Sequence, residues 1–179
     1  MKKYLIKLAC WWYAGKYNRA KGYAAPMTTL DWRLVYSIAQ HESADFTSDL
    51  FLRSNNCFGM RVPKKRKWYG NGETNGYSTY SSVWNSVADY FSWVDYNGLT
   101  VSDDPLMPYV EGWVAQMKQK GYFEASLLGY SNSVGAWYNQ SMLLPSPSVY
   151  FAWALPLSLI IIWNRKKILS QVKRLTKSK

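Results

Sequence analysis

A long uncharged segment near the C-terminus constrains this chain most. Residues 143–163 carry no charged side chain, and residues 149–163 (VYFAWALPLSLIIIW) are apolar apart from Ser158. At about 1.5 Å per residue, a helix over this segment reaches about 31 Å, the thickness of one hydrocarbon core. Residues 143–163 are therefore predicted to form a single transmembrane helix. A buried helix of a soluble domain is the alternative.

The charge distribution indicates an orientation for that helix. The formal net charge is +11, from 22 Lys and Arg against 11 Asp and Glu. Residues 164–179 hold seven of the basic residues and no acid, which leaves 15 basic and 11 acidic side chains for the rest. A basic flank favours the cytoplasmic side, or the inside of a particle, and places the main domain on the opposite, wall-facing side. The small remaining excess gives no reason to expect a specific nucleic-acid partner.

Residues 1–140 are predicted to form one domain. The chain is 48% hydrophobic, enough for a core. Its first 15 residues are interrupted by Lys7 and make a poor signal peptide, so they are expected to be the first helix of the domain. Two cysteines and one histidine are too few for a structural zinc site, and neither a metal nor an organic cofactor is expected. A disulfide between Cys10 and Cys57 stays open.

Apolar periodicity predicts a mainly helical α+β domain. Helices are expected over residues 29–46, after a capping box from Thr28 to Asp31, and over residues 81–98. A third should follow Asp104-Pro105 and end at Gly121. Residues 55–76 are rich in Gly, Asn and Lys, which favours a loop or short hairpin and hence a small β-lobe. The expected inward residues of the later two helices are Trp84, Val87, Phe91, Val94, Val110, Trp113, Val114 and Met117.

Glu42 is the residue best placed for chemistry. It ends a stripe, with Leu34 and Ile38, that is otherwise apolar. A carboxyl group on an inward face is desolvated, which raises its pKa and suits a general acid at neutral pH. A solvent-facing helix-end glutamate, paired with His41 or Arg53, is the alternative.

Three motifs in order around Glu42 resemble the glucosaminidase-type peptidoglycan hydrolases of glycoside hydrolase family 73, which include autolysins and the flagellar rod-cap muramidase. The match covers roughly residues 30–122. It runs from a helix ending in Ala-x-x-Glu-Ser through Asn-Asn-x-Phe-Gly to Tyr-x-Ser-x-x-x-Ser-x-x-Asp-Tyr. The matching residues are Ala39, Glu42, Ser43, Asn55, Asn56, Phe58, Gly59, Tyr80, Ser82, Ser86, Asp89 and Tyr90. The resemblance implies a lysozyme-like fold and cleavage of bacterial cell-wall glycan.

The resemblance also implies roles for single residues. Glu42 would be the general acid that protonates the glycosidic oxygen. Tyr80 would lie in the cleft and bind or steady the reacting sugar, with core packing as its alternative. Asn56, Phe58 and Gly59 would shape the cleft wall. The remaining serines, Asp89 and Tyr90 are expected to cap and pack the following helix.

The second catalytic carboxylate is less well defined by the sequence. Related enzymes place it in the β-lobe, and Glu73 is the sole glutamate between Glu42 and Tyr80. Glu73 is therefore the candidate, with Asp45 and Asp49 in reserve. Alternatively Glu42 works without a carboxylate partner, as in lytic transglycosylases, where a hydroxyl of the sugar attacks and an anhydro product forms.

Aromatic and basic residues of the predicted lobe are candidates for substrate contact. Trp68, Tyr69 and Tyr77 are expected near the sugar, because hexose CH faces pack on aromatic rings. The basic run of residues 64–67 would meet anionic wall polymers or lipid head groups, or form a solvated loop. Cys57 is expected to be a packing residue and not a nucleophile.

Together these features predict a membrane-anchored, single-pass peptidoglycan hydrolase. It would cut the β-1,4 linkage between N-acetylglucosamine and N-acetylmuramic acid, with the catalytic domain facing the wall. Its partners would be peptidoglycan and a lipid membrane. A bacteriophage virion with an internal membrane, and so further particle proteins as partners, is one context, and a bacterial autolysin is the other. A lytic transglycosylase, or a structural virion or envelope membrane protein with a hydrolase-derived domain, are the alternative functions.

Overall fold

The computed structural model describes residues 1–23, 29–102 and 109–147, and these are mainly helical with one two-stranded sheet. The predicted α+β class with a small β-lobe is therefore confirmed. Residues Met1–Leu144 form one compact unit, which ends slightly beyond the predicted limit of 140. The elements are α1 (Lys2–Lys21), α2 (Trp32–Glu42), α3 (Asp49–Ser54), β1 (Gly72–Thr74), β2 (Tyr77–Thr79), α4 (Val83–Asn97), α5 (Tyr109–Gln119) and α6 (Leu127–Ser141).

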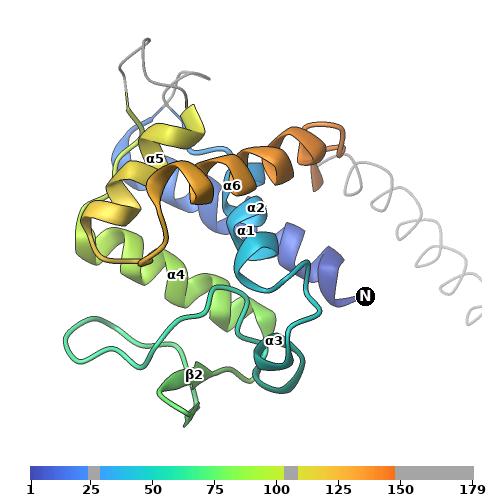
Figure 1. The fold of residues 1–179 in the computed structure, drawn as a ribbon, viewed down its shortest axis with the longest axis vertical. Coiled ribbons are helices and arrows are strands. Elements are labelled where there is room, and N and C mark those ends of the chain that lie inside the picture. The colour runs from blue at the N-terminus through green and yellow to red at the C-terminus, as the bar shows by residue number, and fades with distance from the viewer. Residues whose placement is uncertain (24–28, 103–108, 148–179) are drawn as a thin grey trace, which may run out of the picture. The chain divides into compact units, whose positions relative to one another are not determined.

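Helix α2 lies at the centre of the core. It packs against α1 and α6, while α1 also packs against α4, and α5 packs against α6 (Figure 1). Between Leu34 and Ala39 every residue of α2 is buried, which requires neighbours on most of its circumference. The N-terminal segment is a helix of the domain, as predicted, and buries a stripe of Ile6, Ala9, Cys10, Ala14 and Tyr17.

Helix α2 is shorter than its sequence pattern predicts. Asp31 is its N-cap, with a side chain that accepts a hydrogen bond from the Arg33 backbone N–H, and Thr28 lies outside the described residues. The helix ends at Glu42, because Ala44, Asp45 and Phe46 have φ angles of 49°, 52° and 65° in the left-handed region. The predicted continuation to residue 46 is wrong, and Glu42 stands at the C-terminal end of the helix.

Helix α4 agrees closely with its prediction. The Ser82 side chain caps it by accepting a hydrogen bond from the Asn85 backbone N–H, and Gly98 ends it with a φ of 66°. Val87, Phe91 and Val94 are buried, as expected for one face of the helix. Trp84 is the exception, at 37% exposed, and lies edge-on to Tyr13 of α1.

The β-lobe is a tight hairpin at the far side of α4 from α5 and α6 (Figure 1). Strands β1 and β2 pair antiparallel, with Thr74 opposite Tyr77, and the connecting Asn75 and Gly76 both have positive φ. A two-residue Asn-Gly connection of this kind matches the twist of the strands. Asn75-Gly76 therefore explains where the polar segment turns.

Helix α6 was not predicted. Its sequence, LLGYSNSVGAWYNQS, holds no charge and two glycines, so neither charge patterning nor propensity marks it. Ser126 caps its N-terminus, and Tyr130 and Val134 are buried. The start of the helix expected after Asp104-Pro105 lies outside the described residues; α5 buries Trp113, Val114 and Met117, and Gly121 follows it with a φ of 71°.

In residues 1–23, 29–102 and 109–147, no helix has the length and apolar content needed to span a bilayer. Residues 142–146 form a turn and coil after α6, so the predicted span does not start as a helix at Leu143. Its remainder from residue 148, and the basic tail 164–179, lie outside the described residues. Cys10 and Cys57 are buried free thiols.

Candidate active site

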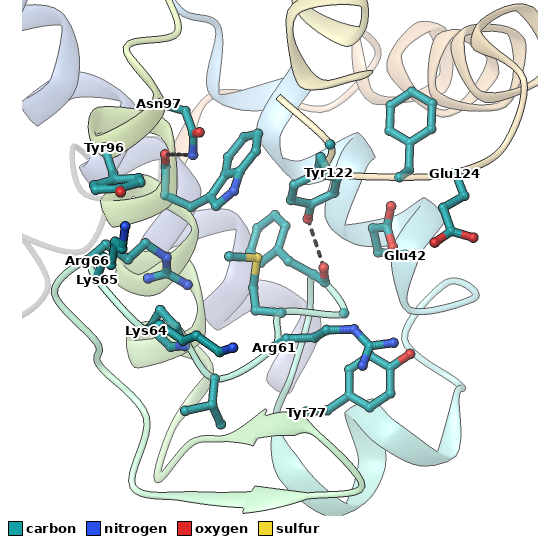
Figure 2. A pocket seen from close by; sticks show the side chains of 18 of the residues that line it. Glu42, Arg61, Lys64, Lys65, Arg66, Tyr77, Tyr96, Asn97, Tyr122 and Glu124 are labelled. Atoms are coloured by element: carbon teal, nitrogen blue, oxygen red, sulfur yellow. Dashed lines mark hydrogen bonds between the residues drawn. The ribbon is translucent and has the colours of Figure 1, made fainter. Parts of the chain in front are cut away.

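A cleft of about 880 Å³ opens beside Glu42 (Figure 2). Its lining comes from residues 58–66 with Tyr77, from the C-terminal end of α4, and from the loop of residues 121–124 between α5 and α6. Segments distant in sequence therefore meet at one place. The charged lining residues are Glu42, Glu124, Arg61, Lys64, Lys65 and Arg66, and the aromatic ones are Phe58, Tyr77, Trp93, Tyr96, Tyr122 and Phe123.

Glu42 is a partly buried carboxyl group with one strong hydrogen-bond partner. Its Oε1 accepts a hydrogen bond from the Tyr130 hydroxyl at 2.5 Å. Burial raises the pKa of Glu42, and the Tyr130 hydrogen bond opposes that shift by favouring the carboxylate. The sequence-based expectation of a desolvated carboxyl with a raised pKa is confirmed, and the pairing with His41 or Arg53 is not the one observed.

Tyr130 is held on several sides and was missed by the sequence analysis. Its ring stacks on Phe123, with centroids 3.8 Å apart and planes within 5°, and His41 lies edge-on at 4.6 Å. Burial and the neighbouring Glu42 raise the pKa of Tyr130, so its hydroxyl keeps its proton as a donor. Because Tyr130 lies on the unpredicted helix α6, 88 residues from Glu42, no local pattern points to it.

The turn after α3 brings Phe58 and Gly59 to the cleft wall, but Phe58 is 1% exposed and its ring stacks on Tyr90 in the core. Gly59 has a φ of 59°, and a Cβ there would lie 3.3 Å from Oε2 of Glu42. Asn56 does not line the cleft: it is 1% exposed, and its side chain accepts from the Met60 backbone N–H and donates to the carbonyl oxygens of Met60 and Ser78. Asn56 therefore shapes the cleft indirectly, by fixing the turn.

Tyr80 lies in the core and not in the cleft. It is 3% exposed, and its hydroxyl donates to Asp89 Oδ2 at 2.8 Å. Asp89 also forms a two-pronged pair with Arg66, at 2.6 and 2.7 Å, and accepts from the Tyr69 backbone N–H. The prediction of a catalytic Tyr80 is corrected: its phenol completes the hydrogen bonding of a fully buried carboxylate.

Glu73 does not lie at the cleft either. Across the hairpin, Glu73 is opposite Ser78, and the next pair along is Thr74 opposite Tyr77. Side chains of successive pairs project from opposite faces of a hairpin. Since Tyr77 lines the cleft, strand alternation directs exposed Glu73 away from it. The prediction of Glu73 as second carboxylate is therefore corrected.

The reserve candidates fail for a different reason. With α2 ending at Glu42, Asp45 turns away and forms an ion pair with Lys3 at 2.8 Å. Asp49 lies on α3 beside Arg53, and both side chains are largely exposed. Neither aspartate lines the cleft.

The structure brings Glu124 to the cleft instead. In Figure 2, Glu124 lies on the same side of the cleft as Glu42. Lys118 holds its loop, because its ammonium group donates to the backbone carbonyls of Phe123, Glu124 and Ala125. Glu124 is one of only four glutamates, which is the signal that could have found it.

Only one of the three lobe aromatics expected near substrate lines the cleft. Tyr77 does so, but the Trp68 indole N–H donates to Ser78 Oγ, and Tyr69 lines a separate hollow of about 300 Å³ beside α1 and α4. The aromatic residues of the cleft that were not predicted come from α4 and from the loop between α5 and α6. Trp93 and Tyr122 meet edge-on at 4.7 Å, and the Tyr122 hydroxyl donates to the Phe58 carbonyl.

In the described part of the chain, no three His, Cys, Asp or Glu side chains come together as a metal site. No protein-family profile matches the sequence. No curated protein matches it either. Among solved structures, the chain is similar to the structure of a type VI secretion system effector-immunity complex from Pseudomonas protegens. The TM-score is 0.48 and the identity 16%, over 73% of this chain and 92% of that chain.

Proposed function

We propose that this chain is a peptidoglycan hydrolase of the lysozyme-like, glucosaminidase type, with Glu42 as its general acid. The observation that carries the proposal is a desolvated carboxyl at an open cleft, on the residue that the Ala-x-x-Glu-Ser motif singles out. Burial raises the pKa of Glu42, so a larger share of the carboxyl is protonated near neutral pH than in a solvated glutamate.

The reaction would begin with proton transfer from Glu42 to the glycosidic oxygen. As the bond from that oxygen to the anomeric carbon breaks, the oxygen leaves as a sugar hydroxyl and Glu42 becomes a carboxylate. The Tyr130 hydroxyl, already 2.5 Å from Oε1, then donates to a charged acceptor, where a hydrogen bond is stronger. Tyr130 is therefore a positioning residue that favours the product state of the proton transfer.

Glu124 replaces Glu73 in the role of second carboxylate. Its exposed carboxylate lines the same cleft and is available to stabilise the oxocarbenium-like charge or to orient a water molecule. Attack of the water oxygen on the anomeric carbon forms the new hydroxyl, and the proton that the water loses passes to the Glu124 carboxylate or returns to Glu42, which completes hydrolysis. If a hydroxyl of the same sugar attacks instead, the outcome is the anhydro product of a lytic transglycosylase.

The aromatic lining suits a polysaccharide. Trp93 and Tyr96 lie three residues apart on α4 and so share a helix face, and Tyr122 adds a third ring. Rings of this kind pack on the CH faces of hexoses while hydroxyl groups stay solvated. The proposed linkage is the β-1,4 bond between N-acetylglucosamine and N-acetylmuramic acid.

The uncharged segment 143–163 and the basic tail 164–179 support a membrane location. We propose that they anchor the catalytic domain on the wall-facing side of a bilayer, either in a bacterial envelope or in a virion membrane. Apolar length and a basic flank are the supporting features.

Wall-clearing assays test the proposal. The complete chain should lower the turbidity of a peptidoglycan suspension, and Glu42→Gln should abolish this, because an amide cannot supply the proton. Glu111→Gln is the matched control, since Glu111 is an exposed glutamate of α5 that does not line the cleft. Clearing by Glu42→Gln at the wild-type rate would rule out the mechanism. Absence of clearing by the wild type on several wall types would favour a structural protein.

A further inference from the structure

One part of the cleft is cationic. Arg61, Lys64 and Lys65 are exposed lining residues, whereas the charge of Arg66 is neutralised by its buried pair with Asp89. Within the ranges that the structure describes, neither lysine forms an ion pair. The cleft therefore presents cationic groups that no acidic side chain among the described residues neutralises.

The segment that carries these cations is held at both ends. At its start, Arg61 bridges to Tyr77 through the backbone, and its guanidinium lies 4.7 Å from the centre of the Tyr77 ring. At its end, the Arg66 side chain is 5% exposed and bonded to Asp89. Because both ends are fixed, the backbone of this segment loses little conformational entropy on binding, and the entropic cost falls on the two lysine side chains.

The charges in the cleft are also separated. In Figure 2, Lys64 and Lys65 lie toward one end and Glu42 with Glu124 toward the other. A ligand whose negative groups lie beside Lys64 and Lys65 is attracted by the two lysines. Its negative groups then stay away from the carboxyl groups of Glu42 and Glu124. A neutral sugar gains nothing from the lysines beyond ordinary hydrogen bonding.

We propose that Lys64 and Lys65 form a subsite for the negatively charged substituents of a glycan strand, which are carboxylate or phosphate groups. The subsite makes the cleft selective for anionic over neutral glycans. This inference rests on the proposed function for the identity of the ligand as a glycan. A nucleic acid is less compatible, because its evenly spaced phosphates would also run past Glu42 and Glu124.

Binding of oligosaccharides to the complete chain tests this subsite. The parent protein carries Glu42→Gln so that no ligand is consumed. Isothermal titration compares a neutral chito-oligosaccharide with a peptidoglycan oligosaccharide of equal length whose peptide carboxylates are free. The variant is Lys64→Gln with Lys65→Gln. The control variant is Lys16→Gln with Arg19→Gln. It also removes two positive charges, from exposed positions of α1 outside this cleft.

We expect the lysine variant to lose about tenfold in affinity for the anionic oligosaccharide and nothing for the neutral one. The parent's affinity for the anionic ligand should fall as salt is raised, and more steeply than that of the variant. Repeating the titration with amidated peptide stems, and with a glycan bearing phosphodiesters, shows which anionic group is the source of the effect.

Other results would overturn the subsite. These are unchanged affinity of the lysine variant for every anionic glycan, an equal loss in the α1 control, or an equal loss for the neutral ligand. Tighter lysine-dependent binding of a single-stranded oligonucleotide would reassign the surface to nucleic acid. If the wild type clears no wall yet its Glu42→Gln form binds anionic glycan through the lysines, the proposed function fails while the subsite stands.

Discussion

At the scale of single residues, the space available to the Glu42 carboxyl depends on residue 59 having no side chain. A Cβ at position 59 would approach Oε2 of Glu42 to 3.3 Å, closer than ordinary van der Waals contact. The left-handed φ of 59° adds a cost of about 1–2 kcal/mol for any L side chain. A glycine at position 59 therefore leaves room for the Glu42 carboxyl beside the cleft.

Gly59→Ala is predicted to lower both stability and turnover. Gly98→Ala is the matched control, because Gly98 has a similar φ of 66° and nothing within 4 Å of its added Cβ. Both variants should lose about 1–2 kcal/mol in urea unfolding. Only Gly59→Ala should also lose wall-clearing activity, and equal activity in the two variants would show that Gly59 does not constrain Glu42.

Tyr130→Phe is predicted to shift the pH profile of the reaction. A general acid works in its protonated form, so activity falls as pH rises through the Glu42 pKa. The Tyr130 hydrogen bond lowers that pKa, and its removal should therefore move the alkaline limb of kcat/KM to higher pH. The carboxylate formed during the reaction also loses a donor, so turnover should fall about tenfold.

Tyr138→Phe is the control for that profile. Tyr138 lies on the same helix, and its hydroxyl donates to Asp31 at 3.1 Å, away from the cleft lining. An alkaline limb that stays in place in Tyr130→Phe, or moves to lower pH, would contradict the assigned role of the hydrogen bond.

At the scale of elements, Asp89 joins the β-lobe to α4. Its carboxylate is fully buried and is bonded to Arg66, to the backbone of Tyr69 and to Tyr80. Three separate parts of the segment between α3 and α4 therefore converge on one side chain of the helix. Removing a single partner from such a pair leaves a buried charge uncompensated.

Asp89→Asn should destabilise the protein by about 3–5 kcal/mol in chemical unfolding. Asp95→Asn, an exposed change on the same helix, should have little effect. Tyr80→Phe should cost about 1–3 kcal/mol and keep wall-clearing activity, because its hydroxyl serves Asp89 and not the cleft. Loss of activity in a stable Tyr80→Phe protein would return Tyr80 to the catalytic site.

The elements that could be predicted are those with strong local signals. Helix α4 has an apolar stripe, a serine cap and a terminal glycine, and α2 has an apolar stripe. The end of α2 could not be predicted, because Ala44, Asp45 and Phe46 adopt left-handed φ angles in succession, which non-glycine residues seldom do. Helix α6 could not be predicted because it is stabilised by packing on α2 and α5 and not by its own propensity.

At the scale of the whole molecule, the site depends on contacts between distant segments. Glu42 was predicted because it ends an apolar stripe, and Phe58, Gly59 and Tyr77, which were expected at the substrate site, are among the residues that line the cleft beside it. Tyr130 and Glu124 come from regions with no periodic or motif signal. Glu73 and Tyr80 were misplaced, because strand alternation and burial, which depend on neighbours, decide where their side chains point.

The compact unit Met1–Leu144 contains the whole cleft, which leads to a prediction about the C-terminal segment. Residues 1–144 should fold and clear peptidoglycan, because core and site lie within them. The complete chain should sediment with vesicles of neutral lipid, whereas residues 1–144 should stay in solution. Equal sedimentation of both would contradict an anchor in residues 143–163.

The identity of the products made from purified peptidoglycan tests the central claim most directly. Mass spectrometry should detect glycan fragments with new reducing or anhydro ends after incubation with the complete chain, and none above background with Glu42→Gln. The kind of end distinguishes hydrolysis from transglycosylation. The same fragments from Glu42→Gln, or no fragments from the wild type on walls of several chemistries, would contradict Glu42 as the acid of a glycan-cleaving enzyme.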